Sequence, residues 1–115
     1  MRRGEIREVD LDPVRGSEAN RRRPAVIVSN DAANITAEQL GRGVVTVVPV
    51  TSNVTRLYPF QVLLPAAETG LAADSKAQAE QVRSVAVDRI GARLGMVPPR
   101  LMARLEDALR LHLGL

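Results

Sequence analysis

Short runs of β-branched and aliphatic residues follow one another along most of the chain, and any helices between them would be too short to connect parallel strands. The run with the strongest strand propensity is residues 44–50, which we expect to form the central strand. Pro49 lies inside this run and cannot donate a ladder hydrogen bond, so the strand is expected to bulge or reach a sheet edge there. Because the helices are too short for crossover connections, a parallel α/β fold is excluded.

Pro, Gly and Asn residues separate the apolar runs, and this spacing predicts six or seven short strands in all. Besides the central one, they are expected at residues 5–11, 24–29, 58–64, 75–79, 83–87 and around 93–97. Residues 31–40 are expected to form a turn or a short helix, and apolar residues at helical spacing after Pro99 predict one amphipathic helix that closes the chain. We expect a small, curved, partly open β-barrel with helical decoration, mainly β or α+β, in a single domain spanning 1–115.

The composition restricts both the core and the chemistry. The chain has 115 residues, and its only aromatic side chains are Tyr58 and Phe60, so we expect a small core of Val, Leu, Ile and Ala, with Phe60 in it. It has no Cys and a single His, His112, which excludes thiolate nucleophiles and Cys or His metal clusters. No apolar run approaches a membrane span, so a soluble cytoplasmic protein without a metal or cofactor is expected.

The positive charge is carried almost entirely by arginine. Sixteen basic residues face thirteen acidic ones, and fifteen of the sixteen are Arg, with Lys76 the single lysine. The planar guanidinium fork favours phosphate or carboxylate partners over a diffuse positive field. An anionic partner is therefore expected.

A run of three arginines, Arg21, Arg22 and Arg23, ends a long polar loop. Such a run is often only a solvated charge cluster. However, Arg23 stands directly before Pro24 and a strand, so its backbone is anchored as a catalytic group requires. We interpret Arg21 and Arg22 as phosphate-steering residues.

Other polar residues have both a structural and a functional interpretation. Hydroxyl residues after a strand usually form turns, but those of Thr51 and Ser52 can also bind a phosphate oxygen. In the long loop, Ser17 can donate to an anion and Glu18 can orient an arginine. His112 lies on the apolar side of the last helix and is expected to be a packed, structural histidine.

The stretch from Glu80 to Arg83 interrupts a strand-like pattern with three polar groups. These groups are either simply solvated or face a concave basic site. In the second case Glu80 would accept a proton, while Gln81 or Arg83 would grip the substrate.

Six blocks, in the same order along nearly the whole chain, resemble the MazF/PemK toxins of bacterial toxin–antitoxin systems. They are residues 3–6, 9–13, 16–18, 23–31, 47–52 and 80–84. The resemblance implies an SH3-like barrel, a homodimer and a metal-independent endoribonuclease that cuts single-stranded RNA, chiefly mRNA, and arrests growth by loss of translation. It also implies a MazE-like antitoxin whose acidic segment competes for the basic RNA groove.

The resemblance also assigns roles to individual positions. Arg23 matches the catalytic arginine of the family, Thr51 the catalytic threonine, and Glu80 the place where some members have an acidic general base. Four further residues fall on positions that line the RNA site: Ser17, Ser52, Gln81 and Arg83. Two positions depart from the pattern: Arg7 replaces a frequent aromatic residue, and Gln78 stands where one branch has a second catalytic arginine.

Two other functions remain open on the sequence. A CcdB-like protein with the same barrel poisons DNA gyrase by protein contact and needs no catalytic groups, although the Arg23 and Thr51 blocks favour the nuclease. A basic RNA-binding module without catalysis is the third possibility. It is disfavoured because single-strand binders usually stack bases on several aromatic side chains, and this chain has two.

Overall fold

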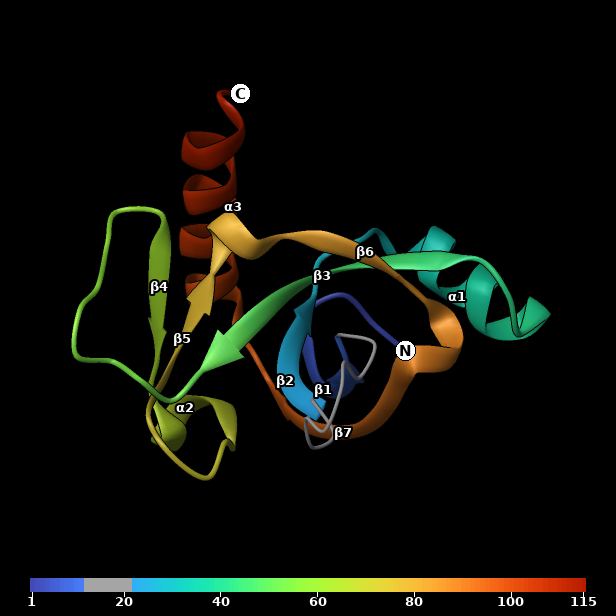
Figure 1. Ribbon diagram of the computed structural model, residues 1–115, viewed down its shortest axis with the longest axis horizontal. Helices are drawn as coiled ribbons and strands as arrows, with labels where there is room; N and C mark the ends of the chain where they lie inside the picture. The colour runs from blue at the N-terminus through green and yellow to red at the C-terminus, as the bar shows by residue number, and fades with distance from the viewer. Residues whose placement is uncertain (12–21) are drawn as a thin grey trace, which may run out of the picture.

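The protein is described by a computed structural model over residues 1–11 and 22–115, and it is built mainly of antiparallel strands (Figure 1). The strands pair in the order β4-β5-β3-β2-β1-β7, and β6 pairs with β3 outside this path. The described elements are β1 (Glu5–Asp10), β2 (Arg22–Ile27), α1 (Asp31–Leu40), β3 (Val44–Thr51), β4 (Gln61–Leu64), α2 (Ala66–Thr69), β5 (Ser75–Gln78), the 3₁₀ turn η1 (Ala79–Gln81), β6 (Arg83–Ala86), the 3₁₀ turn η2 (Val87–Arg89), β7 (Ile90–Met96) and α3 (Pro99–Leu113).

β3 is the central strand, as the sequence predicts, and it changes partner along one edge. Its first half pairs with β6 as far as Val47, whereas Val50 and Thr51 pair with β5. Pro49 lies between these two ladders while it pairs with Ala25 of β2 on the other edge. The ladder to β2 shows no bulge at Pro49, so that expectation is wrong; the irregularity there is instead the change of partner on the opposite edge, which carries β3 from the curved sheet to β5.

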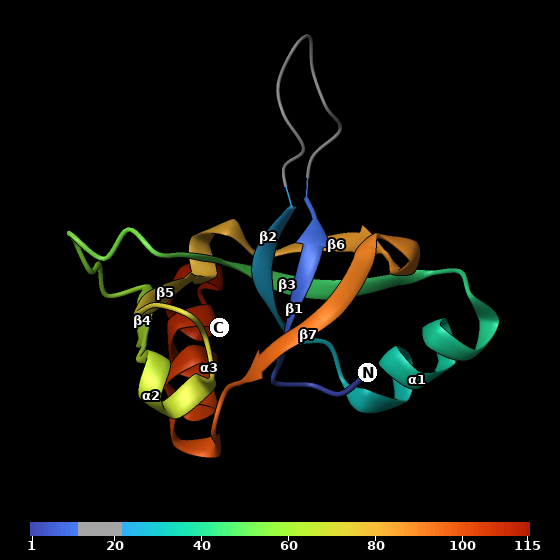
Figure 2. The ribbon, with the colours of Figure 1, turned by 90° about the horizontal axis from the view of Figure 1, so that it is seen from below.

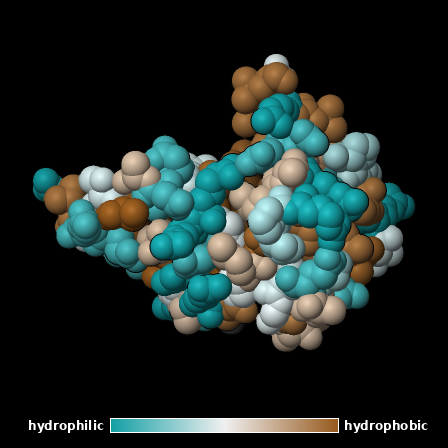
Figure 3. Space-filling model, turned by 180° about the vertical axis from the view of Figure 1, so that it is seen from behind, coloured by the Kyte–Doolittle hydropathy of each residue, from teal (hydrophilic) through white to brown (hydrophobic). Residues whose placement is uncertain are grey.

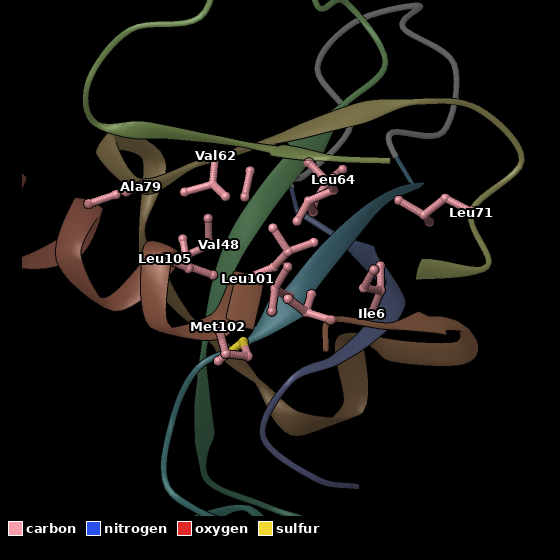
Figure 4. Close-up of a cluster of buried hydrophobic side chains, with 14 residues drawn as sticks. Ile6, Val48, Val62, Leu64, Leu71, Ala79, Leu101, Met102 and Leu105 are labelled. Carbon is pink, nitrogen blue, oxygen red and sulfur yellow. The ribbon is translucent and has the colours of Figure 1, made fainter. Parts of the chain in front are cut away.

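The two faces of the sheet cover two separate apolar clusters. The inner cluster lies within the curve of the strands, which Figure 1 shows wrapping around the middle of the molecule. Its buried members are Val9, Leu11, Ala25, Ile27, Ala37, Val45, Val47 and Val85. The helix-side cluster fills the space between the other face and α3 and includes Ile6, Val26, Val48, Val50, Leu64, Leu101 and Leu105 (Figure 4). This two-sided burial explains why β2 and β3 are almost continuously apolar.

The helices close the molecule at opposite ends of the sheet (Figure 2). The side chain of Asn30 accepts a hydrogen bond from the N–H of Ala33 and caps α1, which confirms the helical alternative for residues 31–40. Pro99 begins α3 at its first turn, as expected. No described helix has the length and apolar character needed to cross a membrane.

Three expectations are wrong in detail. Residues 58–60 are not part of a strand, because β4 begins only at Gln61. Phe60 is half-buried and stacks on Tyr58, with ring centroids 5.4 Å apart, instead of entering either cluster. His112 is exposed near the end of α3, with its ring 6.5 Å from that of Phe60, so it is not a packed histidine. The core is nevertheless aliphatic, as the composition predicts.

Arg7 forms an ion pair within β1 and a hydrogen bond to the neighbouring strand β7. Arg7 donates to the buried carboxylate of Glu5 (2.8 Å) and to the carbonyl of Gly91 (2.8 Å). Burial raises the pKa of Glu5, but the hydrogen bond and charge of Arg7 outweigh this effect and leave that pKa below its ordinary value. The arginine that departs from the family pattern therefore has a structural partner on its own strand.

Candidate active site

A basic hollow of about 270 Å³ lies where β2 and β3 leave the inner cluster. It is lined by Leu11, Arg23, Pro49, Gln78, Gln81 and Arg83. Arg23 reaches it because side chains alternate along β2, and Ala25 and Ile27 on the same face point into the inner cluster. Arg23 therefore continues the buried face of the strand to the point where that face meets solvent.

Three of the predicted site residues are brought together in this hollow, namely Arg23, Gln81 and Arg83. Arg23 and Arg83 come from strands on either side of β3, because β2 and β6 both pair with it. Both guanidiniums are exposed, and no carboxylate is among the described residues that line the hollow. Two guanidiniums and two carboxamides around one depression form a site for an anion that also carries hydrogen-bonding edges.

Thr51 lies beside this hollow without lining it. The register that pairs Ala25 with Pro49, continued by two residues, places Arg23 opposite Thr51 on the same face of the sheet. The Thr51 hydroxyl accepts a hydrogen bond from the backbone N–H of Asn53 (3.2 Å), which orients the hydroxyl at the end of β3. Ser52 is exposed and follows as the first residue of the connection to β4.

The side chain of Glu80 points away from this hollow, towards β4. Its Oε2 accepts a hydrogen bond from Nε2 of Gln61 on β4 (2.7 Å), and its Oε1 is buried with no partner among the described residues. The cause is the 3₁₀ turn η1, which begins directly after Gln78, the last residue of β5, and so ends the strand alternation there. Gln78 and Gln81 therefore both reach the hollow, while Glu80 between them turns towards β4.

Arg22 lies in a different hollow from Arg23. Consecutive residues of a strand point to opposite faces, and Arg22 lines a depression of about 460 Å³ with Asp10, Asp88 and Arg89. The arginine run is therefore divided between two surfaces. Ser17, Glu18 and Arg21 lie outside the described residues.

Gln78 lines the hollow although the sequence does not predict it as a site residue. At this position the sequence shows only a departure from the family pattern, because a strand-like alternation through residues 75–83 does not place Gln78 with Gln81. Residues 1–11 and 22–115 contain no group of three or more His, Cys, Asp or Glu side chains arranged to hold a metal ion.

The described residues form a small, partly open β-barrel with a basic hollow at its rim. Residues 2–113 match the family of PemK-like, MazF-like toxins of type II toxin–antitoxin systems. The chain therefore belongs to this family, and the resemblance seen in its sequence is confirmed.

Individual relatives agree with this assignment. The chain is 64% identical over 115 residues to endoribonuclease MazF9 of Mycobacterium tuberculosis, covering 100% of this chain and 98% of the relative. It resembles the crystal structure of MazF from Deinococcus radiodurans with a TM-score of 0.76 at 29% identity, covering 100% and 97% of the two chains. A mycobacterial endoribonuclease solved in complex with its cognate antitoxin gives a TM-score of 0.74 at 26% identity, covering 100% and 96%. These findings place the chain among the MazF-type endoribonuclease toxins and do not favour the gyrase-poisoning alternative.

Proposed function

We propose that this endoribonuclease toxin cuts single-stranded RNA, chiefly mRNA, at a short sequence without a metal ion, and so stops translation and growth. In this reaction the ribose 2′-OH attacks the adjacent phosphorus and the bond to the 5′-oxygen of the next nucleotide breaks. The products carry a 2′,3′-cyclic phosphate and a 5′-OH. The observation that supports this proposal most strongly is the convergence of Arg23, Arg83, Gln78 and Gln81 on one hollow.

Each group has a task that its chemistry allows. The Arg23 guanidinium stabilises the negative charge that develops on the phosphate oxygens in the transition state. Arg83 and the carboxamides of Gln78 and Gln81 hold the phosphate and the base edges of the flanking nucleotides. The Thr51 hydroxyl, oriented by Asn53, donates to a phosphate oxygen from the neighbouring strand end.

The proton of the 2′-OH needs a different acceptor. A guanidinium keeps its proton at neutral pH, so neither arginine of the hollow is a general base. The Glu80 carboxylate can act as the base only if it leaves Gln61 and turns towards the hollow. The other acceptor that the proposed reaction supplies is a non-bridging oxygen of the substrate phosphate, which takes the 2′-OH proton and passes it to the departing 5′-oxygen.

The attack by the 2′-OH is tested with a short RNA that contains one 2′-deoxy nucleotide immediately 5′ of the scissile phosphate. We expect no cleavage at that bond, while a second cleavage site in the same strand is cut at the normal rate and serves as the internal control. The measurement is gel electrophoresis of the labelled strand. Cleavage at the deoxy position would show that water or another external nucleophile attacks.

Two partners complete the proposal. We expect an antitoxin with an acidic segment, because such a segment can occupy the same basic hollow as an RNA phosphate.

We also expect a homodimer in the cytoplasm. The end of α3 carries exposed Leu111, Leu113 and Leu115, and Figure 3 shows apolar side chains gathered at this end of the molecule. A second copy would shield this apolar surface from water.

A further inference from the structure

The face of the sheet that carries the hollow extends beyond it onto the β4–β5 hairpin. Thr51 of β3 pairs with Lys76 of β5, and directly paired residues of antiparallel strands point to the same side. Gln78, two residues after Lys76, lines the hollow. Lys76 therefore lies on the same face as Gln78 and Thr51.

Lys76 is an unusual buried cation. It is the only lysine of the chain and is 7% exposed. Its Nζ donates to the backbone carbonyl of Arg56 (2.6 Å), and no carboxylate within residues 1–11 and 22–115 forms an ion pair with it. A buried ammonium without a carboxylate partner destabilises a fold unless its hydrogen bonds compensate for the lost water. A neutral, apolar residue would fill this position at lower cost if packing were its only task.

The carbonyl that Lys76 binds belongs to the connection between β3 and β4, residues 52–60, which Figure 1 shows as a wide arc from the end of β3 to the start of β4. This connection, here called the Thr51 loop, is exposed from residue 52 to residue 59. Gln61 ties it a second time, by accepting a hydrogen bond from the N–H of Tyr58 (3.2 Å). The loop begins directly after Thr51, so its course determines the backbone N–H groups that meet the Thr51 hydroxyl.

We propose that Lys76 is a positioning residue for RNA cleavage. Its ammonium fixes the course of the Thr51 loop, and with it the surroundings of the Thr51 hydroxyl where the loop begins. It also adds a positive charge to the face that carries Thr51 and Gln78, which draws the RNA strand towards Arg23. This inference rests on the proposed function and extends it, because neither the family resemblance nor the lining of the hollow includes Lys76.

Three variants separate the two contributions of the ammonium. Lys76→Met has a similar length but neither donor nor charge, Lys76→Gln keeps a donor without the charge, and Lys76→Arg keeps both. Asp74→Asn is the matched control, because Asp74 precedes the same strand and accepts a hydrogen bond from the N–H of Ala66, but it ties α2 instead of the Thr51 loop.

The experiment measures kcat and KM on a defined single-stranded RNA, together with hydrogen–deuterium exchange of the loop amides. Lys76→Met is expected to lower kcat/KM about tenfold, mainly through a higher KM, because the RNA then meets a less ordered loop and one positive charge fewer on this face. Exchange at residues 53–58 is expected to become faster. Lys76→Arg is expected to keep kcat/KM and loop exchange close to those of the unmodified protein. Lys76→Gln is expected to keep the exchange rate but to raise KM. Asp74→Asn is expected to leave both kcat/KM and exchange unchanged.

Several outcomes would overturn the proposal. Unchanged exchange of the Thr51 loop in a folded Lys76→Met protein, which lacks the donor to the Arg56 carbonyl, excludes the positioning role, whatever happens to RNA. An equal loss of activity in Asp74→Asn, or no rescue by Lys76→Arg, reduces Lys76 to a general contributor to stability. If Lys76→Met does not fold, Lys76→Gln tests the charge: an unchanged KM in this variant overturns the proposal. If the unmodified protein cleaves no RNA, the proposed function fails, and the exchange measurement still decides whether Lys76 holds the loop.

Discussion

Replacing Arg23 by Ala is expected to lower kcat for RNA cleavage by about 100- to 1,000-fold, the range seen when one group that stabilises transition-state charge is removed. Arg23 is exposed and lines the hollow, and its guanidinium forms no hydrogen bond or ion pair with the rest of the described chain. The fold therefore does not depend on it. Single-turnover cleavage of a defined RNA measures the loss, and circular dichroism checks the fold.

The neighbouring residue provides the control. Arg22→Ala removes the same charge one position away, but from the opposite face of β2 and from the second hollow. We expect this variant to weaken RNA binding modestly, with a reduced dependence on salt, and to leave kcat nearly unchanged. If both variants lost kcat equally, net charge and not position would be the important property, and the catalytic assignment of Arg23 would be wrong.

Replacing Gly95 by Ala is expected to lower the free energy of unfolding by about 2–4 kcal/mol, because it creates a clash with the backbone of α2. A Cβ atom at Gly95 would overlap the backbone carbonyl oxygen of Thr69 at the end of α2. A backbone atom cannot rotate away as a side chain can, so β7 and α2 must separate. Urea denaturation followed by circular dichroism measures the loss.

Gly91 allows a comparison on the same strand. A Cβ at Gly91 would approach the carbonyl oxygen of Glu8 to 3.0 Å, a tight contact that a small shift relieves. Gly91→Ala is therefore expected to lose less stability than Gly95→Ala. Equal denaturation midpoints for Gly95→Ala and the unmodified protein would show that β7 and α2 do not pack as closely as described.

The sequence predicts the strands well where apolar residues continue for several positions, because burial on both faces leaves little ambiguity. The run around Val47 and the run around Val26 became β3 and β2, and the proline-led helix became α3. It predicts less well where a few residues decide a local turn. The four-residue helix α2 has no periodicity to detect, and Tyr58 and Phe60, although they favour strands, stack on each other in a loop.

In the candidate site, too, the sequence predicts what depends on neighbouring residues and misses what depends on a turn or on strand register. Arg23 was identifiable from its own neighbours, since Pro24 and the following strand anchor it locally. The direction of Glu80 and the convergence of Gln81 with Gln78 depend on one 3₁₀ turn, which follows β5 and ends the strand alternation. The pairing of Lys76 with Thr51 depends on strand register between distant segments, and no local pattern in a single sequence determines that register.

The central claim, that this chain cuts RNA without a metal ion, is tested most directly by incubating the purified protein with a long single-stranded RNA in EDTA and mapping the cut positions and end groups. The account predicts discrete cuts at a recurring short sequence, with 2′,3′-cyclic phosphate and 5′-OH ends, and none in the Arg23→Ala protein. Cleavage that disappears in EDTA, or ends that carry a 5′-phosphate, would contradict it.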